Sequence, residues 1–229
     1  MVTSNTGTTA THKLRVLCLH GYVQDSSTLK TMLRNHIAAL DDCVEFAPNI
    51  IRPYDIDGMD NMARIAAVRS GKAVVRDTRC WYHLKSAKPE IVFGLENSFD
   101  FLSAVLEKQG PFDGVFGFSQ GGLMAALLSS LLEHKSPVLN SSHPALKFAI
   151  ISSGFMLQDA KWIHLYESPI STPSLHIFGV LDGMITLNRS MELKNCFVRP
   201  EELCFVGAHF VPKTDEAVKR ISDFVRQFA

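Results

Sequence analysis

The run Gly117-Phe118-Ser119-Gln120-Gly121 constrains the fold of this chain more than any other stretch. Before it, Val115 and Phe116 read as the end of a buried strand, and after it Leu123 to Leu132 form an apolar helical pattern. A serine placed this way within Gly-x-Ser-x-Gly is typical of a nucleophile elbow, a turn so sharp that the serine backbone is strained. Glycines fit on both sides because a Cβ would collide with the tight turn. A glycine-rich structural turn is the alternative interpretation.

Strand and helix patterns alternate along the rest of the chain, and most of the strands are apolar throughout. Together with the elbow, this alternation predicts an α/β-hydrolase fold, with a mostly parallel central sheet and helices on both faces. The expected strands are 14–19, 44–47, 115–116, 146–152, 174–178 and 202–206, and the expected helices are 26–40, 95–109, 123–132, 186–198 and 215–228.

The length of 229 residues suits one large domain. The first segment, 1–12, is polar and rich in threonine, so we expect a flexible tail. We expect residues 13–229 to form a single α/β-hydrolase domain. Within it, 49–89 shows no regular period, since residues such as Pro53 and Gly58 interrupt it, and a cap or pocket insertion is predicted there.

The composition argues against several classes of function. Basic and acidic residues number 23 each, which gives no excess of positive charge for nucleic acid. No apolar run approaches the roughly 20 residues of a membrane span, and the polar N-terminus does not read as a signal peptide. The five cysteines form no C-x-x-C pair, so we expect reduced thiols and a cytoplasmic location. No metal-ligand spacing or nucleotide-binding glycine motif occurs, so neither a metal nor a cofactor is expected.

Three polar residues follow predicted strands in the order serine, aspartate, histidine: Ser119, Asp182 and His209. The site of an open parallel sheet lies beyond the carboxyl ends of its strands, so these side chains are expected to meet there. The same chain order occurs in hydrolases with a nucleophile elbow. His209 would accept the proton of Ser119, and Asp182 would hold the imidazole in the productive tautomer. The alternatives are a turn-forming Asp182 and a His209 that belongs to the core or the surface.

The negative charge that develops on a substrate carbonyl oxygen needs two N–H donors. We expect one to be the backbone N–H of Gln120, directly after the serine. The other should come from the loop after the first strand, where we assign Tyr22, with Val23 as the second choice. His20, at the start of this loop, is expected to brace it. Three more histidines are interpreted as structural: His83, His164 and His176.

Four stretches resemble the FSH family of serine hydrolases, which includes fungal and animal esterases of the α/β-hydrolase fold. They are Leu17–Tyr22, Gly110–Gly122, His143–Phe155 and Gly207–Pro212. The second stretch, Gly-Pro-Phe-Asp-Gly followed by Gly-Phe-Ser-Gln-Gly, is the most specific, and the matches extend over nearly the whole chain. The family's catalytic residues correspond to the serine, aspartate and histidine already singled out.

The resemblance also implies a pocket. Arg79-Cys80-Trp81-Tyr82 is similar to the family's Arg-x-Trp-aromatic segment, so Trp81 and Tyr82 are expected to line the acyl pocket. Phe155 and Phe210 are also expected to bind substrate. Two departures stand out: Gly122 occupies a position where many members have alanine, and Asp182 lacks the acidic neighbour often found beside it. The second departure leaves Asp159 as a distant alternative for the catalytic acid.

The resemblance implies hydrolysis of carboxylic esters or thioesters, and we expect a small-molecule substrate with an apolar acyl group. One alternative is a thioesterase or acyltransferase that releases a polyketide or acyl chain from a carrier protein. The segment from Arg52 to Glu90 supports it weakly, since it carries eight basic and five acidic residues. The other alternative is a ligand-binding protein that kept the fold without catalysis.

Overall fold

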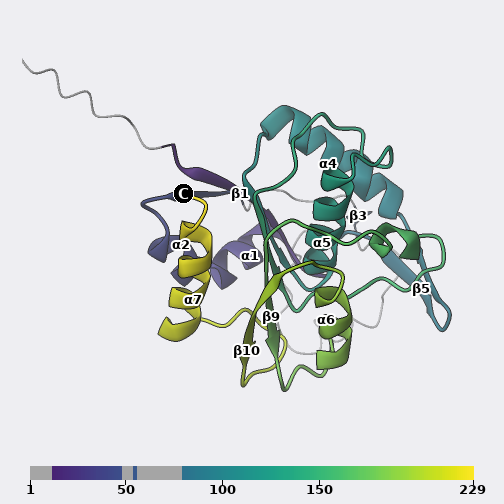
Figure 1. Cartoon of the computed structure of the whole chain (residues 1–229). Helices are drawn as coiled ribbons and strands as arrows, with labels where there is room; N and C mark the ends of the chain where they lie inside the picture. Colours follow the sequence, from purple (N-terminus) through teal and green to yellow (C-terminus); the bar gives the residue numbers. More distant parts are fainter. Residues whose placement is uncertain (1–11, 48–53, 56–78) are drawn as a thin grey trace, which may run out of the picture.

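The computed structural model describes residues 12–47, 54–55 and 79–229, and a six-stranded sheet runs through them (Figure 1). The strands lie in the order β10-β9-β8-β7-β1-β2, and each neighbouring pair is parallel. Their bounds are β1 Leu14–Leu19, β2 Val44–Ala47, β7 Gly114–Phe118, β8 Phe148–Ser152, β9 Ser174–Gly179 and β10 Pro200–Phe205. The parallel sheet and its flanking helices confirm the predicted fold class.

The direction of strand addition reverses at β1, which places the site. From β1 the chain adds β2 on one side, and it then returns to add β7, β8, β9 and β10 on the other. Leu19, the last residue of β1, pairs with Gly117 near the end of β7. The loop after β1 and the elbow after β7 therefore leave the sheet side by side. In open α/β sheets such a switch point is where ligands bind.

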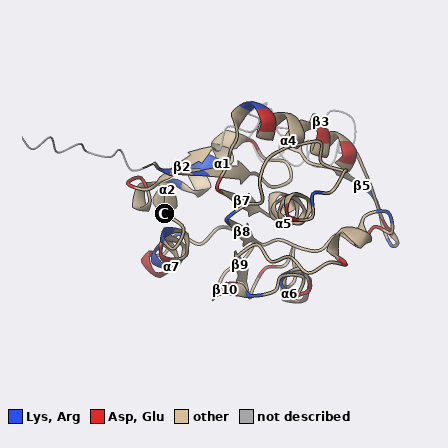
Figure 2. Ribbon diagram, turned by 45° about the horizontal axis from the view of Figure 1, so that its top comes forward, with Lys and Arg blue, Asp and Glu red and all other residues tan. Residues whose placement is uncertain are grey.

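Helices cover both faces of the sheet, and Figure 2 shows α5 and α6 on one side and α2 and α7 on the other. Their bounds are α1 Ser26–Met32, α2 Arg34–Ala39, α4 Leu95–Gln109, α5 Gln120–Glu133, α6 Leu187–Lys194 and α7 Asp215–Arg226, with a 3₁₀ helix at Ile163–Tyr166. Successive residues of β1 alternate between two cores, as a pleated strand requires. Leu17 and Leu19 join the core with α4 and α5, while Val16 and Cys18 join the core with α1 and α7.

The predicted helix over 26–40 is wrong as a single element. The structure divides it into α1 and α2 at Leu33, whose backbone lies at φ −87° and ψ 0°. Leu33 still accepts the N–H of Ile37 and is fully buried. The apolar spacing therefore continues across the break, which is why the periodicity did not reveal it. The helix predicted over 186–198 is also shorter, because the chain turns at residues 195–197.

The predicted irregular segment 49–89 contains regular structure in its described residues. β4 (Arg79–Cys80) pairs with β3 (Tyr54–Asp55), and β5 (His83–Ala87) forms an antiparallel hairpin with β6 (Glu90–Phe93). The pattern of β5 is polar and its pairing is irregular, so periodicity gave no strand signal. Most of the predicted cap, and nearly all of the predicted tail 1–12, lies outside the described residues.

Candidate active site

Ser119 occupies the strained turn that the glycine spacing predicts. Its backbone lies at φ 55° and ψ −117°, between the end of β7 and the first residue of α5. A Cβ on Gly117 would lie 2.0 Å from the carbonyl oxygen of Gly121, and one on Gly121 would lie 2.1 Å from that of Leu19. Only glycine therefore lets the turn close and α5 approach β1. A non-glycine residue at positive φ carries strain that the surrounding structure has to maintain.

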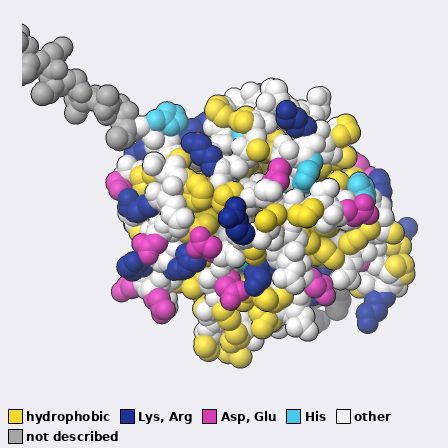
Figure 3. Space-filling view, in the orientation of Figure 1, with side chains coloured by type: hydrophobic (Ala, Val, Ile, Leu, Met, Phe, Trp, Pro, Cys, Tyr) yellow, Lys and Arg dark blue, Asp and Glu magenta, His cyan; other side chains and the backbone are white. Residues whose placement is uncertain are grey.

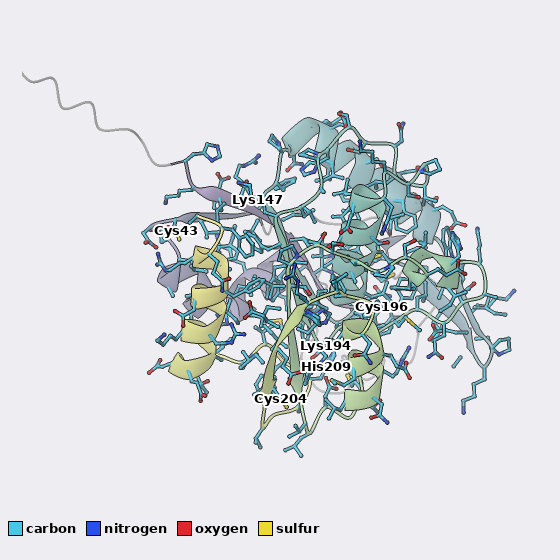
Figure 4. All side chains as sticks on the ribbon, viewed as in Figure 1. Cys43, Lys147, Lys194, Cys196, Cys204 and His209 are labelled. Atoms are coloured by element: carbon cyan, nitrogen blue, oxygen red, sulfur yellow. The ribbon has the colours of Figure 1, made fainter. Side chains whose placement is uncertain are left out.

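Ser119, His209 and Asp182 form one hydrogen-bonded chain. His209 Nδ1 lies 2.7 Å from Asp182 Oδ2, and His209 Nε2 lies 2.9 Å from Ser119 Oγ. A carboxylate can only accept, so Nδ1 carries the proton and Nε2 is free to accept the Ser119 hydroxyl proton. The three residues follow β7, β9 and β10, strands that are not all adjacent. Figure 4 shows His209 on the side of the molecule where β9, β10 and their following loops lie.

Asp182 is held from two directions. Its Oδ1 accepts the backbone N–H groups of Met184 and Ile185, both at 2.9 Å, while Oδ2 faces His209. Burial raises the pKa of this carboxyl, but the hydrogen bonds from His209 and from the two N–H groups outweigh burial and lower it. Asp182 is therefore an ionised acceptor at neutral pH. The turn that it forms with residues 184–185 and its contact with His209 are compatible, so the turn-forming interpretation does not compete with the catalytic one.

The loop that carries His209 is fixed by the opposite layer of helices. His36 of α2, a buried residue, donates from Nε2 to the carbonyl of Pro212 at 2.9 Å. Burial lowers the pKa of His36 despite the opposing effect of that carbonyl, so its ring is neutral at pH 7. The ring of Phe118 also packs 4.9 Å from that of His209. This role of His36 was not predicted, because its spacing on an apolar helix face carries no sign of a partner 176 residues away.

Asp159, the alternative acid, has other partners in the structure. Its Oδ2 accepts the N–H of Val92 in β6 at 2.8 Å, and its Oδ1 accepts the N–H of Lys161 at the same distance. Its carboxylate thus joins the β5–β6 hairpin to the segment after β8. His209 Nδ1 faces Asp182 instead.

The predicted oxyanion donors lie on neighbouring segments. Gln120 is the first residue of α5, where backbone N–H groups have no partner within the helix. Tyr22 follows β1 and is 43% exposed, and Val23 beside it adopts a positive φ of 56°. The tight fit of Gly121 against the carbonyls of Leu19 and His20 brings the two segments together. Which N–H groups bind the oxyanion stays a prediction.

The four predicted pocket residues differ in exposure. Trp81 is fully buried, Tyr82 and Phe155 are also buried, and Phe210 is 45% exposed. The Arg189 guanidinium covers the ring of Phe155 at 4.6 Å, and Phe210 packs 5.2 Å from the ring of Phe205. Their contact with substrate stays a prediction.

The described residues show no group of three or more potential metal ligands among their histidine, cysteine and acidic side chains. No helix within them is both long and apolar enough to cross a bilayer. The five cysteines all fall in the described part of the chain and all are free thiols. Burial raises the pKa of Cys80 to about 12, so it is protonated at neutral pH.

The sheet, the strained turn and the two helix layers define a protein of the α/β-hydrolase class. The fold resembles that of acyl-protein thioesterase 2 from Zea mays, with a TM-score of 0.64 at 15% identity over 96% of this chain and 95% of the other. It resembles Arabidopsis thaliana SOBER1 equally, with a TM-score of 0.64 at 17% identity over 94% of this chain and 98% of the other.

The chain belongs to the FSH family of serine hydrolases, since the family model described as serine hydrolase (FSH1) matches residues 9–221. Esterase GA18864 of Drosophila pseudoobscura pseudoobscura is 32% identical over 93% of this chain and 71% of its own length. Esterase OVCA2 of Danio rerio is 31% identical over 94% of this chain and 97% of its own length. Family of serine hydrolases 3 of Saccharomyces cerevisiae is 28% identical over 93% and 84%. The family assignment made from sequence is confirmed, and the chain is a serine hydrolase.

Proposed function

We propose that Ser119, His209 and Asp182 form the catalytic triad of an esterase that works through an acyl-enzyme. His209 Nε2 takes the hydroxyl proton while Ser119 Oγ attacks the substrate carbonyl carbon. The resulting imidazolium returns this proton to the leaving alcohol or thiol as the carbon–heteroatom bond breaks. Water then repeats the two steps on the acyl-enzyme, which releases the acid and frees Ser119. The hydrogen-bonded chain from Oγ through the imidazole to the carboxylate is the observation that carries this proposal.

The N–H of Gln120 and the N–H of Tyr22 stabilise the oxyanion in this proposal, with Val23 as the alternative to Tyr22. The start of α5 adds the positive end of its dipole at the same place. Loss of one such donor typically lowers kcat by about 10²- to 10³-fold.

The proposed substrates carry apolar acyl groups. Exposed apolar side chains flank the loops that hold Asp182 and His209: Val180, Leu181, Met184, Val206 and Phe210. Figure 3 shows hydrophobic side chains gathered at the lower edge of the molecule, over the end of the sheet where β9 and β10 lie. Such a surface beside the site favours contact with an acyl chain over a polar substrate. Tyr82, Phe155 and Phe210 remain the proposed pocket residues, whereas the Trp81 side chain has no exposed surface through which to contact an acyl chain.

The test combines active-site labelling with turnover. A fluorophosphonate should label wild-type protein and fail to label Ser119→Ala. The control Ser129→Ala, which changes a buried serine within α5, should label normally. p-Nitrophenyl esters of graded length and matched acyl-thioesters then rank the substrates. Folded wild-type protein that neither labels nor turns over any acyl donor would favour the ligand-binding alternative. Product analysis with a competing alcohol separates hydrolysis from acyl transfer.

A further inference from the structure

The side chain of Gln120 makes contacts that the proposed mechanism does not use. Its Oε1 accepts the backbone N–H of Trp81 at 2.8 Å, and its Nε2 donates to the carbonyl of Tyr82 at 2.9 Å. The oxygen and the nitrogen of the carboxamide thus bond to the main chain of residues 81–82, much as the backbone of a neighbouring strand would. All three residues are buried, so water cannot replace these bonds at low cost.

Trp81 extends the contact to the other side of the site. Its indole N–H donates to the carbonyl of His20 at 2.8 Å, and the two rings lie 5.3 Å apart. Its own carbonyl accepts the hydroxyl of Ser98 on α4. Trp81 is a large side chain without exposed surface, and its polar groups bond to three segments far apart in sequence.

These contacts join the two segments that carry the predicted oxyanion donors. Gln120 carries one N–H at the start of α5, and His20 opens the loop that carries Tyr22. A Cβ on Gly121 would lie 2.5 Å from the His20 carbonyl, so that carbonyl lies between α5 and the Trp81 indole. A shift of residues 81–82 would therefore move the His20 peptide and the first turn of α5 together.

We infer that the Gln120 carboxamide and Trp81 are positioning residues that fix the spacing of the two oxyanion donors. This inference rests on the proposed serine-hydrolase function and assigns Trp81 a role other than contact with the acyl chain. The clamp, meaning Gln120, Trp81 and the main chain of Tyr82, thus joins residues 81–82 to the elbow.

The first test replaces Gln120 by residues of similar size. Gln120→Met removes both hydrogen bonds, and we expect kcat to fall by about 10- to 100-fold with KM nearly unchanged, less than loss of a whole donor costs. Gln109→Met, at an exposed position on α4, is the matched control and should keep wild-type rates. Active-site titration with the fluorophosphonate and thermal unfolding correct for the folded fraction. If Gln120→Met does not fold, Gln120→Asn replaces it.

The second test uses acid rescue. In Gln120→Glu, an ionised carboxylate would repel the Tyr82 carbonyl, whereas the protonated acid restores a donor and an acceptor in the same places. Burial raises the pKa of such a carboxyl above its ordinary value of about 4.3. We expect kcat of Gln120→Glu, divided by kcat of Gln120→Met, to rise at least about threefold from pH 8 to pH 5. The ratio cancels effects of pH that both variants share.

A third variant separates positioning from substrate contact. Trp81→Phe keeps an aromatic ring and removes the bond to the His20 carbonyl, so kcat should fall equally for short and long acyl chains. Any one of four results overturns the clamp: wild-type kcat in Gln120→Met, a pH-independent ratio, a rise in KM alone, or a change of chain-length preference in Trp81→Phe. An active, fluorophosphonate-labelled wild type with one of these results rejects the clamp and leaves the proposed function standing. An inactive wild type rejects both.

Discussion

Replacement of Asp182 by asparagine tests the direction of proton transfer in the site. Asp182 Oδ1 accepts two backbone N–H groups, and Oδ2 accepts His209 Nδ1–H. In Asp182→Asn the amide oxygen best stays with the two N–H groups, which turns the amide NH₂ toward His209. The imidazole then accepts on Nδ1 and carries its proton on Nε2, where it faces Ser119 Oγ. No base remains for the serine hydroxyl.

The size of the effect follows from the hydrogen bonds that the productive tautomer would break. If the proton stays on Nδ1, there are two possibilities. Either the amide NH₂ of residue 182 faces the Nδ1–H of His209, donor against donor, or the amide turns over and its NH₂ faces the backbone N–H groups of Met184 and Ile185. Two or three buried groups then lack partners, at about 1–3 kcal/mol each. Two such groups together cost about 2–6 kcal/mol, which corresponds to a loss of kcat between about 30-fold and about 10⁴-fold, and a triad aspartate-to-asparagine change in a serine protease costs about 10⁴.

The assay is hydrolysis of a p-nitrophenyl ester at pH 8, with the active fraction measured by fluorophosphonate titration. We expect KM within about threefold of wild type, because Asp182 does not touch the substrate in this mechanism. Asp159→Asn is the matched control: it also removes a buried carboxylate that accepts two N–H groups, and kcat should stay within about threefold. Asp182→Asn with near-wild-type kcat, or loss of turnover in a folded Asp159→Asn, would refute the assignment of the acid.

Two further predictions concern stability, each measured by urea unfolding. Gly117→Ala would place a Cβ 2.0 Å from the Gly121 carbonyl oxygen, so it should lower the free energy of unfolding by at least about 3 kcal/mol. Gly183→Ala, with open space around it, should change this free energy by no more than about 0.5 kcal/mol. Equal stability of the two variants would contradict this packing. Burial raises the pKa of Glu133, but hydrogen bonds from residues 171–172 outweigh it and lower the pKa. Its stabilisation is therefore present above its unfolded pKa of about 4.3 and lost as pH falls through the folded value, so Glu133→Gln should cost about 1–2 kcal/mol at pH 7 and less at pH 3. If the difference in unfolding free energy between wild type and Glu133→Gln were as large at pH 3 as at pH 7, this explanation would be wrong.

Strand positions followed from the sequence because most strands of this sheet are buried on both faces. Gly114–Phe118, Phe148–Ser152 and Ser174–Gly179 are buried at every position, so an apolar run marks each one. β5 and β6 form a two-stranded hairpin whose side chains are largely exposed, so its sequence carries no such apolar run. The break at Leu33 escaped prediction for the opposite reason, since its apolar period is unbroken.

The candidate triad could be predicted because parallel topology does the positioning. A polar residue shortly after a strand of a parallel sheet must lie near the carboxyl edge, so Ser119, Asp182 and His209 could be placed there without knowledge of the loops. Side chains that hold those loops are different. Neither the bond from His36 to Pro212 nor the pairing of the Gln120 carboxamide with residues 81–82 leaves a local pattern. Such contacts depend on how segments approach in space.

The candidate triad and the proposed oxyanion donors are positioned in different ways. The three candidate catalytic side chains follow three parallel strands of one sheet, whose register brings them to the same edge, and hydrogen bonds join them there. The proposed oxyanion donors have no such register, because one lies in the loop after β1 and the other in the first turn of α5. A contact between those segments is therefore needed, and the carbonyl of His20, held between Gly121 and the Trp81 indole, supplies it. Variants at Gln120 and Trp81 should consequently affect the rate of oxyanion formation and leave the bond between His209 and Asp182 intact.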